Sequence, residues 1–214
     1  MDRRIVIVGN GDIPAGAAEI IDVCDLVIRF NDCRSIGAGG AKTDIVAVCN
    51  TGRPGKAMTT MPEWRENKAV RQASAIWSVR DPGKFEQMRD TILADHPELD
   101  DFCDDYSAGF AEIAKASGKK HHIIPRAVHD EVDAALAQLS SEPYVCPSSG
   151  LIVLAYLLGL SSTENDQIVI AGFGHQGWDG HPFVAEKKLF DAFEAEGKIT
   201  RLSQASLFSV SQGA

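Results

Sequence analysis

Residues 4–16 read RIVIVGNGDIPAG, a β-branched apolar run that ends at Gly9 and continues through Asn10 and Gly11 to a proline. Such a run predicts a buried strand followed by a tight turn into a helix. Its spacing, G-x-G-x-x-x-x-G, is two residues longer than the dinucleotide fingerprint, and no P-loop lysine follows. Because ligands of open α/β sheets bind at the carboxyl ends of strands, we expect Gly9, Asn10 and Gly11 to contact a ligand. The alternative is a tight turn without a ligand.

The rest of the chain alternates strand patterns with helix patterns. Further strands are expected at Asp25–Asn31, Asp44–Cys49, Ala75–Val79, His122–Ile124 and Gln167–Ala171. Helices are expected at Ala15–Asp22, Glu63–Ala73, Pro82–Ala94, the later part of Asp100–Ser117, Ala127–Leu139, Leu151–Leu160 and Pro182–Glu196. This order predicts an α/β fold, a Rossmann-like three-layer sandwich with a mainly parallel sheet, in a single domain over residues 1–214.

Composition excludes several classes of protein. The chain has 214 residues, is 44% hydrophobic and carries a formal charge of −9, which argues against a nucleic-acid or membrane-surface partner. No apolar run of about 18 residues is present, and the apolar part of the N-terminus is too short for a signal peptide. Five cysteines without CxxC spacing favour free buried thiols in a reducing, cytoplasmic setting.

The second expected strand ends in a group of polar residues. Arg29 lies inside the apolar run, where a buried guanidinium requires an anion or a cluster of carbonyl groups. Asn31 offers an amide to a phosphate or a ribose hydroxyl, and Asp32 offers a carboxylate to a ribose. The alternative for this Asn-Asp pair is a local turn without a ligand.

A second polar stretch, PSSG at residues 147–150, opens an almost unbroken apolar helix pattern. The first amides of a helix lack intrahelical partners, and its dipole is positive at that end. We therefore expect Ser148, Ser149 and Gly150 to face an anion.

These stretches together resemble the motifs of the animal-type sialyltransferases. VGNG followed by DLVIRFN and GAGGAKTD is similar to the large sialyl motif, PSSGLIVLAYLLGL with DQIVIAGFG to the small motif, and HPFVAEKKLFDAFEAEGKI to the very small motif. The three occur in the family's order and cover residues 5–51, 146–174 and 181–199. The segment 52–145 resembles nothing that we recognise.

The resemblance implies the sialyltransferase variant of the GT-A fold and an activity. The family transfers sialic acid from CMP-sialic acid to a hydroxyl acceptor, with inversion and without a metal or other cofactor. Asn10 and Asn31 match the asparagines that hold the phosphate and ribose of CMP, and residues 148–150 match those that touch the nucleotide. His181 matches the catalytic base and Glu186 its accompanying acid.

The chain also departs from the family pattern. It lacks the cysteine before the first strand and its partner in the small motif, in keeping with a disulfide-free cytosolic relative. The family's third motif is shortened to residues 175–180, where His175 is the candidate to contact the phosphate. The chain is shorter than typical catalytic domains, so we expect its acceptor-binding loops to be reduced.

Three functions remain open at the level of sequence. The first is a glycosyltransferase that uses CMP-sialic acid or a related CMP-sugar, with an acceptor that the sequence does not identify. The second is a CMP- or nucleotide-sugar-binding accessory protein without transfer activity; short bacterial chains that this one resembles carry a urease-operon label, although nothing here resembles a nickel carrier. The third is an oxidoreductase, which rests on Gly9–Gly11 and Asp32 alone.

Weaker features receive plainer interpretations. For residues 50–56, NTGRPGK, two interpretations are open: a basic turn, or a position where Arg53 and Lys56 meet a carboxylate or phosphate. The carboxylates within 98–106 are interpreted as a solvated helix start, with a hard-cation site as the alternative. His121, His122 and His129 fit no zinc spacing and are expected to form a basic surface patch. Trp178 lies in a motif loop, where its ring could stack on a base or a sugar.

Overall fold

A computed structural model describes residues 3–160 and 166–203. Its seven described strands form one sheet in the order β5-β4-β3-β2-β1-β6-β7, and every neighbouring pair is parallel. The strands are β1 (Arg4–Val8), β2 (Leu26–Phe30), β3 (Ile45–Val48), β4 (Ala75–Ser78), β5 (Lys120–Ile123), β6 (Gln167–Ala171) and β7 (Thr200–Arg201).

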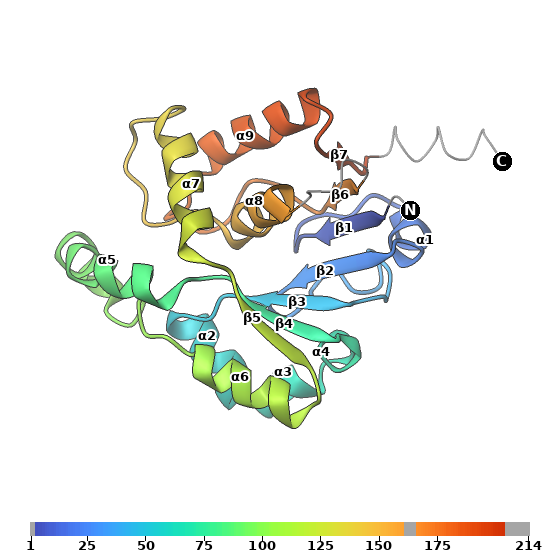
Figure 1. Cartoon of the computed structure of the whole chain (residues 1–214), viewed down its shortest axis with the longest axis horizontal. Coiled ribbons are helices and arrows are strands. Elements are labelled where there is room, and N and C mark those ends of the chain that lie inside the picture. The colour runs from blue at the N-terminus through green and yellow to red at the C-terminus, as the bar shows by residue number, and fades with distance from the viewer. Residues whose placement is uncertain (1–2, 161–165, 204–214) are drawn as a thin grey trace.

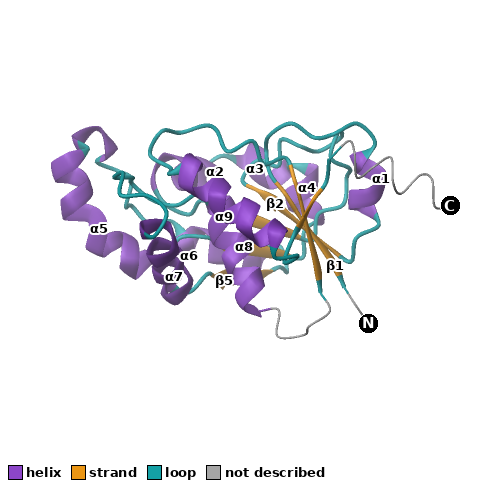
Figure 2. Ribbon diagram, turned by 90° about the horizontal axis from the view of Figure 1, so that it is seen from above, coloured by secondary structure: helices purple, strands orange, loops and turns teal. Residues whose placement is uncertain are grey.

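Helices cover both faces of the sheet. On one face lie α1 (Ala17–Asp22), α2 (Gly52–Thr60), α3 (Pro62–Glu66), α4 (Lys68–Gln72) and α6 (Ser107–Ala116). On the other face lie α7 (Arg126–Ala137), α8 (Ser149–Leu160) and α9 (Phe183–Ala195), as Figure 1 shows. The helix α5 (Pro82–Asp95), followed by the 3₁₀ turn η1 (Pro97–Leu99), extends away from the sheet (Figure 2). The predicted three-layer α/β fold is confirmed.

Side-chain alternation along β1 explains why this strand is apolar throughout. Ile5 and Ile7 pack with α8 and α9 on one face, whereas Val6 and Val8 pack with α1 on the other. A parallel strand buried on both faces reads as a continuous hydrophobic run. The helix α8 is similarly buried, with Leu151, Ile152, Val153 and Leu154 in the core.

The strand order changes direction beside β1. From β1 the chain proceeds outward through β2, β3, β4 and β5, and then crosses back to place β6 on the other side of β1. In open α/β sheets such a switch point opens a crevice at the carboxyl ends of the two strands. The loops that follow β1 and β6 are the two predicted motif loops, Gly9–Gly11 and Gly172–Gly174.

Several local expectations differ from the structure. The stretch 50–56 is not a turn but leads into α2. The expected helix 63–73 is two short helices, because Asn67 ends α3 and its side chain accepts from the amide of Ala69 to begin α4. The last strand, β7, was not expected. His129 is buried rather than on the surface, and its Nε2 lies 2.9 Å from the carbonyl of Val79.

Two further chain-wide features follow from the described residues. All five cysteines are buried and free, as expected. Within residues 3–160 and 166–203, no helix combines the length and the apolarity needed to cross a bilayer.

Candidate functional site

A cleft of about 610 Å³ lies at the switch point between β1 and β6. It gathers residues from the loops after β1, β2 and β6, from the start of α8 and from the first turn of α9. Ten of the twelve residues predicted for the site line it: Gly9, Asn10, Gly11, Asn31, Ser148, Ser149, Gly150, His175, His181 and Glu186. The three motifs, which are far apart in sequence, therefore meet in one place.

The backbone of the glycine turn after β1 packs closely against the backbone of the loop after β6. The amide of Gly9 donates to the carbonyl of Ala171 at 2.8 Å, and the amide of Gly11 donates to that of Gly172 at 3.0 Å. A Cβ on Gly9 would lie 2.3 Å from the carbonyl oxygen of Gly172, and one on Gly11 would lie 2.8 Å from it. These two glycines line the cleft, but their amides are already occupied by backbone carbonyls.

Asn10 and Asn31 both use part of their side chain to hold the backbone. The Nδ2 of Asn10 donates to the carbonyl of Phe30 at 3.2 Å, and its Oδ1 accepts from the amide of Arg34 at 3.0 Å. Asn31 has a φ of 53°, and its Oδ1 accepts from the amide of Cys49 at 2.8 Å. The Nδ2 of Asn31 has no partner among the described residues, so this amide remains available to a ligand in the cleft.

Two predicted ligand contacts lie elsewhere. Arg29 is fully buried, and its guanidinium donates to the carbonyls of Lys42 and Gly39 and to the hydroxyls of Thr43 and Ser35. Of the two partners open to this residue, the structure shows the carbonyl cluster, and Arg29 fastens the loop between β2 and β3. It does not line the cleft.

Asp32 also lies outside the cleft. It is exposed, and one of its carboxylate oxygens accepts from the Nε of Arg34 at 3.2 Å. The side chain borders an adjoining hollow of about 480 Å³ with Trp64 and Asn67. Its place corrects the expectation of a ribose-binding carboxylate in the main cleft.

Glu186 and Ser148 form a buried pair at the start of α8. The carboxylate is 1% exposed, accepting from the amide and the hydroxyl of Ser148, both at 2.6 Å. Burial raises the pKa of Glu186 and the bonds from Ser148 partly offset this effect. The Ser148 hydroxyl is thus directed to Glu186, which corrects the expectation that both serine hydroxyls face a ligand. Glu186 holds the helix start in position.

The next two residues keep their donors free. Ser149 and Gly150 are the first two residues of α8, and within the described residues neither amide has a hydrogen-bond partner. Packing requires a glycine at position 150, because a Cβ there would lie 2.5 Å from the ring of Phe173. Free amides at the positive end of a twelve-residue helix provide an anion-binding position in this cleft.

His181 is held in one orientation by the backbone. Its Nδ1 lies 2.8 Å from the carbonyl of Cys146, which can only accept, so Nδ1 carries the proton and Nε2 the lone pair. The ring packs edge to face with Trp178 at 4.9 Å and with Phe183 at 5.4 Å. Burial lowers the pKa of His181, the hydrogen bond to Cys146 partly opposes this effect, and the charge of Arg80 lowers the pKa further by a smaller amount. The imidazole is therefore neutral at pH 7, with Nε2 able to accept a proton.

His175 lines the same cleft and has a backbone φ of 46°. Its ring packs edge to face on Phe190 at 4.8 Å, and its Nε2 is buried without a partner among the described residues. Burial, followed by the charges of Arg201 and Lys187, lowers the pKa of His175. A buried ring nitrogen without a partner is costly, so this atom is a candidate for contact with a ligand.

Some residues that line the cleft were not predicted from the sequence. Arg34 is the one cationic side chain among the lining residues and is 69% exposed at the rim. Its signal in the sequence was a position shortly after a predicted strand end, where ligand contacts gather. Phe173 and Phe183 supply aromatic walls. No group of three metal-ligating side chains is arranged as a cation site within residues 3–160 and 166–203.

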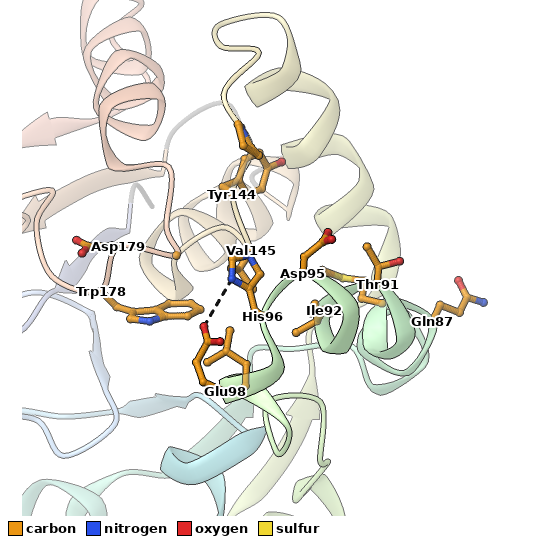
Figure 3. Close-up of a pocket in the computed structure, with 14 residues that line it drawn as sticks. Gln87, Thr91, Ile92, Asp95, His96, Glu98, Tyr144, Val145, Trp178 and Asp179 are labelled. Atoms are coloured by element: carbon orange, nitrogen blue, oxygen red, sulfur yellow. Dashed lines mark ion pairs between the residues drawn. The ribbon is translucent and has the colours of Figure 1, made fainter.

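A second cavity, of about 570 Å³, lies beside the first and is drawn in Figure 3. Its walls come from α5, η1, residues 143–145 and the loop Trp178–Gly180. Figure 3 shows the ring of Trp178 directed into this cavity, with His96 and Glu98 paired at 3.6 Å beyond it. Since the same ring packs on His181, Trp178 separates the second cavity from the cleft.

Solved structures resemble this fold. A mammalian sialyltransferase aligns over 94% of this chain and 69% of its own length, with a TM-score of 0.51 and 17% sequence identity. The sialyltransferase CstII from Campylobacter jejuni, determined in complex with the substrate analogue cytidine-5'-monophosphate, aligns over 93% and 78% of the two chains, with a TM-score of 0.47 and 15% identity. The first likeness places the protein in the sialyltransferase-like class of α/β folds; at that identity it concerns the fold alone.

A closer relative comes from the curated proteins. The urease operon 23 kDa accessory protein of Rhizobium meliloti (strain 1021) is 51% identical over 212 residues, which are 99% of this chain and 98% of that protein. The chain belongs to the family of this accessory protein. No family model matches the sequence.

Proposed function

We propose that the protein is a glycosyltransferase that transfers an acidic sugar from a CMP-activated donor, such as CMP-sialic acid, to a hydroxyl acceptor. One observation carries the proposal. A neutral histidine with its lone pair at Nε2, His181, lines the same cleft as the free amides of Ser149 and Gly150. A general base and an anion-binding helix start are the two groups that displacement of a nucleotide phosphate requires.

The donor would be held by groups that the fold leaves without partners. The amides of Ser149 and Gly150 face the phosphate, and the Nδ2 of Asn31 meets the phosphate or ribose. Arg34 at the rim and the Nε2 of His175 add a charge and a polar contact. The choice of CMP over other nucleotides rests on the motif resemblance.

The chemical step is a direct displacement. The acceptor oxygen attacks the anomeric carbon while its proton passes to the Nε2 of His181. The bond between the anomeric carbon and the phosphate oxygen breaks, and CMP leaves with the electron pair. The helix start stabilises the charge that grows on the phosphate. We place the acceptor in the cleft itself, next to His181, which lines it.

Ligand binding is tested by thermal shift with CMP, CMP-sialic acid, a UDP-sugar and NAD. A ligand at a hundredfold excess over its dissociation constant stabilises by about 2.7 kcal/mol, which is roughly 5–10 °C for a chain of this size. We expect CMP to stabilise the protein. Stabilisation by NAD and not by CMP would favour the oxidoreductase and overturn the proposal.

The asparagine contact needs a variant that keeps the fold. Asn31→Asp retains the Oδ1 that accepts from Cys49 and tolerates the positive φ, whereas Asn31→Ala loses both features. Because Asn31→Asp replaces an amide donor with a carboxylate, the variant side chain repels a phosphate. We expect Asn31→Asp to keep cooperative unfolding and to lose the CMP shift.

Catalysis is tested by transfer from CMP-sialic acid to a panel of sugar acceptors. His181→Asn should keep the CMP shift and lose about 100- to 10,000-fold in rate. The rate of the parent should rise with pH as His181 deprotonates, with a midpoint below the ordinary histidine value of 6.5. Activity of His181→Asn equal to that of the parent would remove His181 from the mechanism. The resemblance also predicts that activity survives EDTA.

A second candidate function is a nucleotide-sugar-binding accessory protein without transfer activity. It is favoured by the 51% identity to a protein named as a urease operon accessory protein. The two functions share the CMP shift and differ in turnover. A parent that binds CMP but shows neither transfer nor donor hydrolysis across the acceptor panel is the binding protein.

A further inference from the structure

Arg80 follows β4 and is buried next to the candidate base. Its side chain is 7% exposed. The Nη1 donates to the hydroxyl of Thr51 at 2.5 Å, and the Nη2 lies 3.6 Å from the thiol of Cys146. The guanidinium lies over the rings of Phe85 and Phe102, at 4.9 and 4.4 Å from their centres. Every one of these partners is neutral.

A buried guanidinium without a carboxylate is unusual. Among the described residues, no ion pair includes Arg80, whereas other arginines such as Arg89 and Arg201 are paired. Removing an arginine from water without a counter-ion costs free energy, and an aromatic cage offsets only part of it. The group stays protonated at every working pH. Its positive charge therefore acts on whatever titratable group lies beside it.

The titratable group that this charge affects is His181, because Cys146 contacts both Arg80 and His181. The thiol of Cys146 contacts Arg80 on one side and lies 3.9 Å from the Nδ1 of His181 on the other. The carbonyl of the same residue accepts from that Nδ1 at 2.8 Å. Trp178 makes a second route, since its ring packs on both Phe102 and His181, at 5.5 and 4.9 Å.

We propose that Arg80 is a positioning residue that keeps the imidazole of His181 neutral, so that Nε2 presents a lone pair to the cleft. Its charge, without a counter-ion, opposes a second positive charge on the ring, while Cys146 holds the proton on Nδ1. The inference rests on the proposed function for its catalytic meaning, but the charge state of His181 is measured without any substrate.

Other groups around His181 do not supply this effect. Burial raises the pKa of Cys146 to about 12, so this residue stays a thiol and does not neutralise Arg80. The carboxylate of Glu186 on α9 is bonded to Ser148. Burial is the largest cause of the lowered pKa of His181, and of the charged groups on the described elements Arg80 is the one whose charge lowers it further.

A purely structural role predicts something different. Arg80 also ties β4 to β3 through its backbone, because its amide and carbonyl bond to the side chain of Asn50 at 2.8 and 2.9 Å. Those bonds need no guanidinium. If packing were the whole role, a long apolar side chain in the Phe85–Phe102 cage would serve without changing His181.

The experiment is an NMR titration of the histidine ring protons, with the His181 signal assigned by its absence in His181→Asn. Arg80→Met removes the charge and keeps the length, whereas Arg80→Lys keeps the charge. We expect the pKa of His181 to rise in Arg80→Met and to stay near that of the parent in Arg80→Lys. In transfer assays the acidic limb of the rate profile should move to higher pH by the same interval.

Because Arg80→Met could fail to fold, the inference has a second test, Thr51→Asp. Thr51→Asp places a carboxylate on the Nη1 of Arg80 and leaves the guanidinium in its cage. It should raise the pKa of His181 as Arg80→Met does. An unchanged His181 titration in either folded variant overturns the inference. If the parent shows no transfer but the titrations shift as expected, the role of Arg80 stands and the proposed function fails.

Discussion

The turn after β1 and the start of α8 both line one cleft, and only the start of α8 has free backbone donors. In the turn, the amides of Gly9 and Gly11 are bonded to the carbonyls of Ala171 and Gly172. At the helix start, the amides of Ser149 and Gly150 have no partner within the described residues. The sequence predicted a ligand contact at both stretches, because each joins glycine to a polar residue at the end of an element.

The difference shows that glycine serves two purposes at such a site. In the turn it permits two backbone segments to approach closely, and in α8 it makes room for the ring of Phe173. Neither purpose is itself ligand binding. The amides of α8 are free because Glu186 satisfies Ser148 alone and the helix geometry leaves the next two donors without acceptors.

The largest expected effect tests the structural side of this comparison. Gly9→Ala places a Cβ 2.3 Å from a backbone carbonyl oxygen that cannot move aside. We expect a loss of about 3 kcal/mol or more in the free energy of unfolding, which is roughly 6–12 °C in melting temperature. Gly159→Ala is the control, since a Cβ there meets nothing within 4 Å and alanine favours the helix by up to about 1 kcal/mol. Equal melting of Gly9→Ala and the parent would contradict the close approach.

A smaller effect tests the ligand-binding side. Ser149→Pro removes one free amide at the first helical position, which proline tolerates. Loss of a charge-assisted bond of about 1.5–3 kcal/mol should weaken CMP binding roughly 10- to 150-fold, measured by calorimetry. Ser149→Ala removes the hydroxyl and keeps the amide, so it serves as the matched control. If the two variants bind CMP equally, the amide is not used.

The smallest effect concerns the residue that prepares the helix start. Glu186→Gln keeps an acceptor for the amide of Ser148 and removes a buried titrating group. Because the folded pKa of Glu186 is raised, its contribution to stability is full below the unfolded value of 4.5 and is lost as pH rises through the folded value. The variant should therefore lose more melting temperature relative to the parent at pH 4.5 than at pH 7.5. The opposite order in paired thermal melts would show that the carboxylate is stabilised as an anion.

Arg29 and Arg80 are both buried, and their surroundings likewise depend on the fold and not on the local sequence. Arg29 was expected to need an anion or a carbonyl cluster, and the structure supplies carbonyls and hydroxyls from the loop that follows β2. Arg80 drew no attention in the sequence, yet it lies without a counter-ion beside His181. The fold of the chain between the strands brings Arg80, and not Arg29, next to His181.

Local sequence determined the elements and their order. The apolar runs that became β1, β2, β3 and β6 and the continuous apolar helix α8 were all predicted, because burial on both faces leaves no polar positions. The motif order also predicted that Asn31, Ser149 and His181 share a site, and they line one cleft. The two short helices α3 and α4 were read as one, since the side-chain cap at Asn67 is a local hydrogen bond that periodicity does not report.

Tertiary structure alone decided which polar groups remain available. Each donor or acceptor in the cleft is free or occupied according to what a distant segment places against it: the carbonyl of Gly172 accepts from Gly11, Glu186 accepts from Ser148, and the amide of Cys49 donates to Asn31. The sequence determined where donors and acceptors occur along the chain. Their pairing depended on approaches of less than 3.5 Å between residues far apart in sequence, and only the folded packing sets those distances.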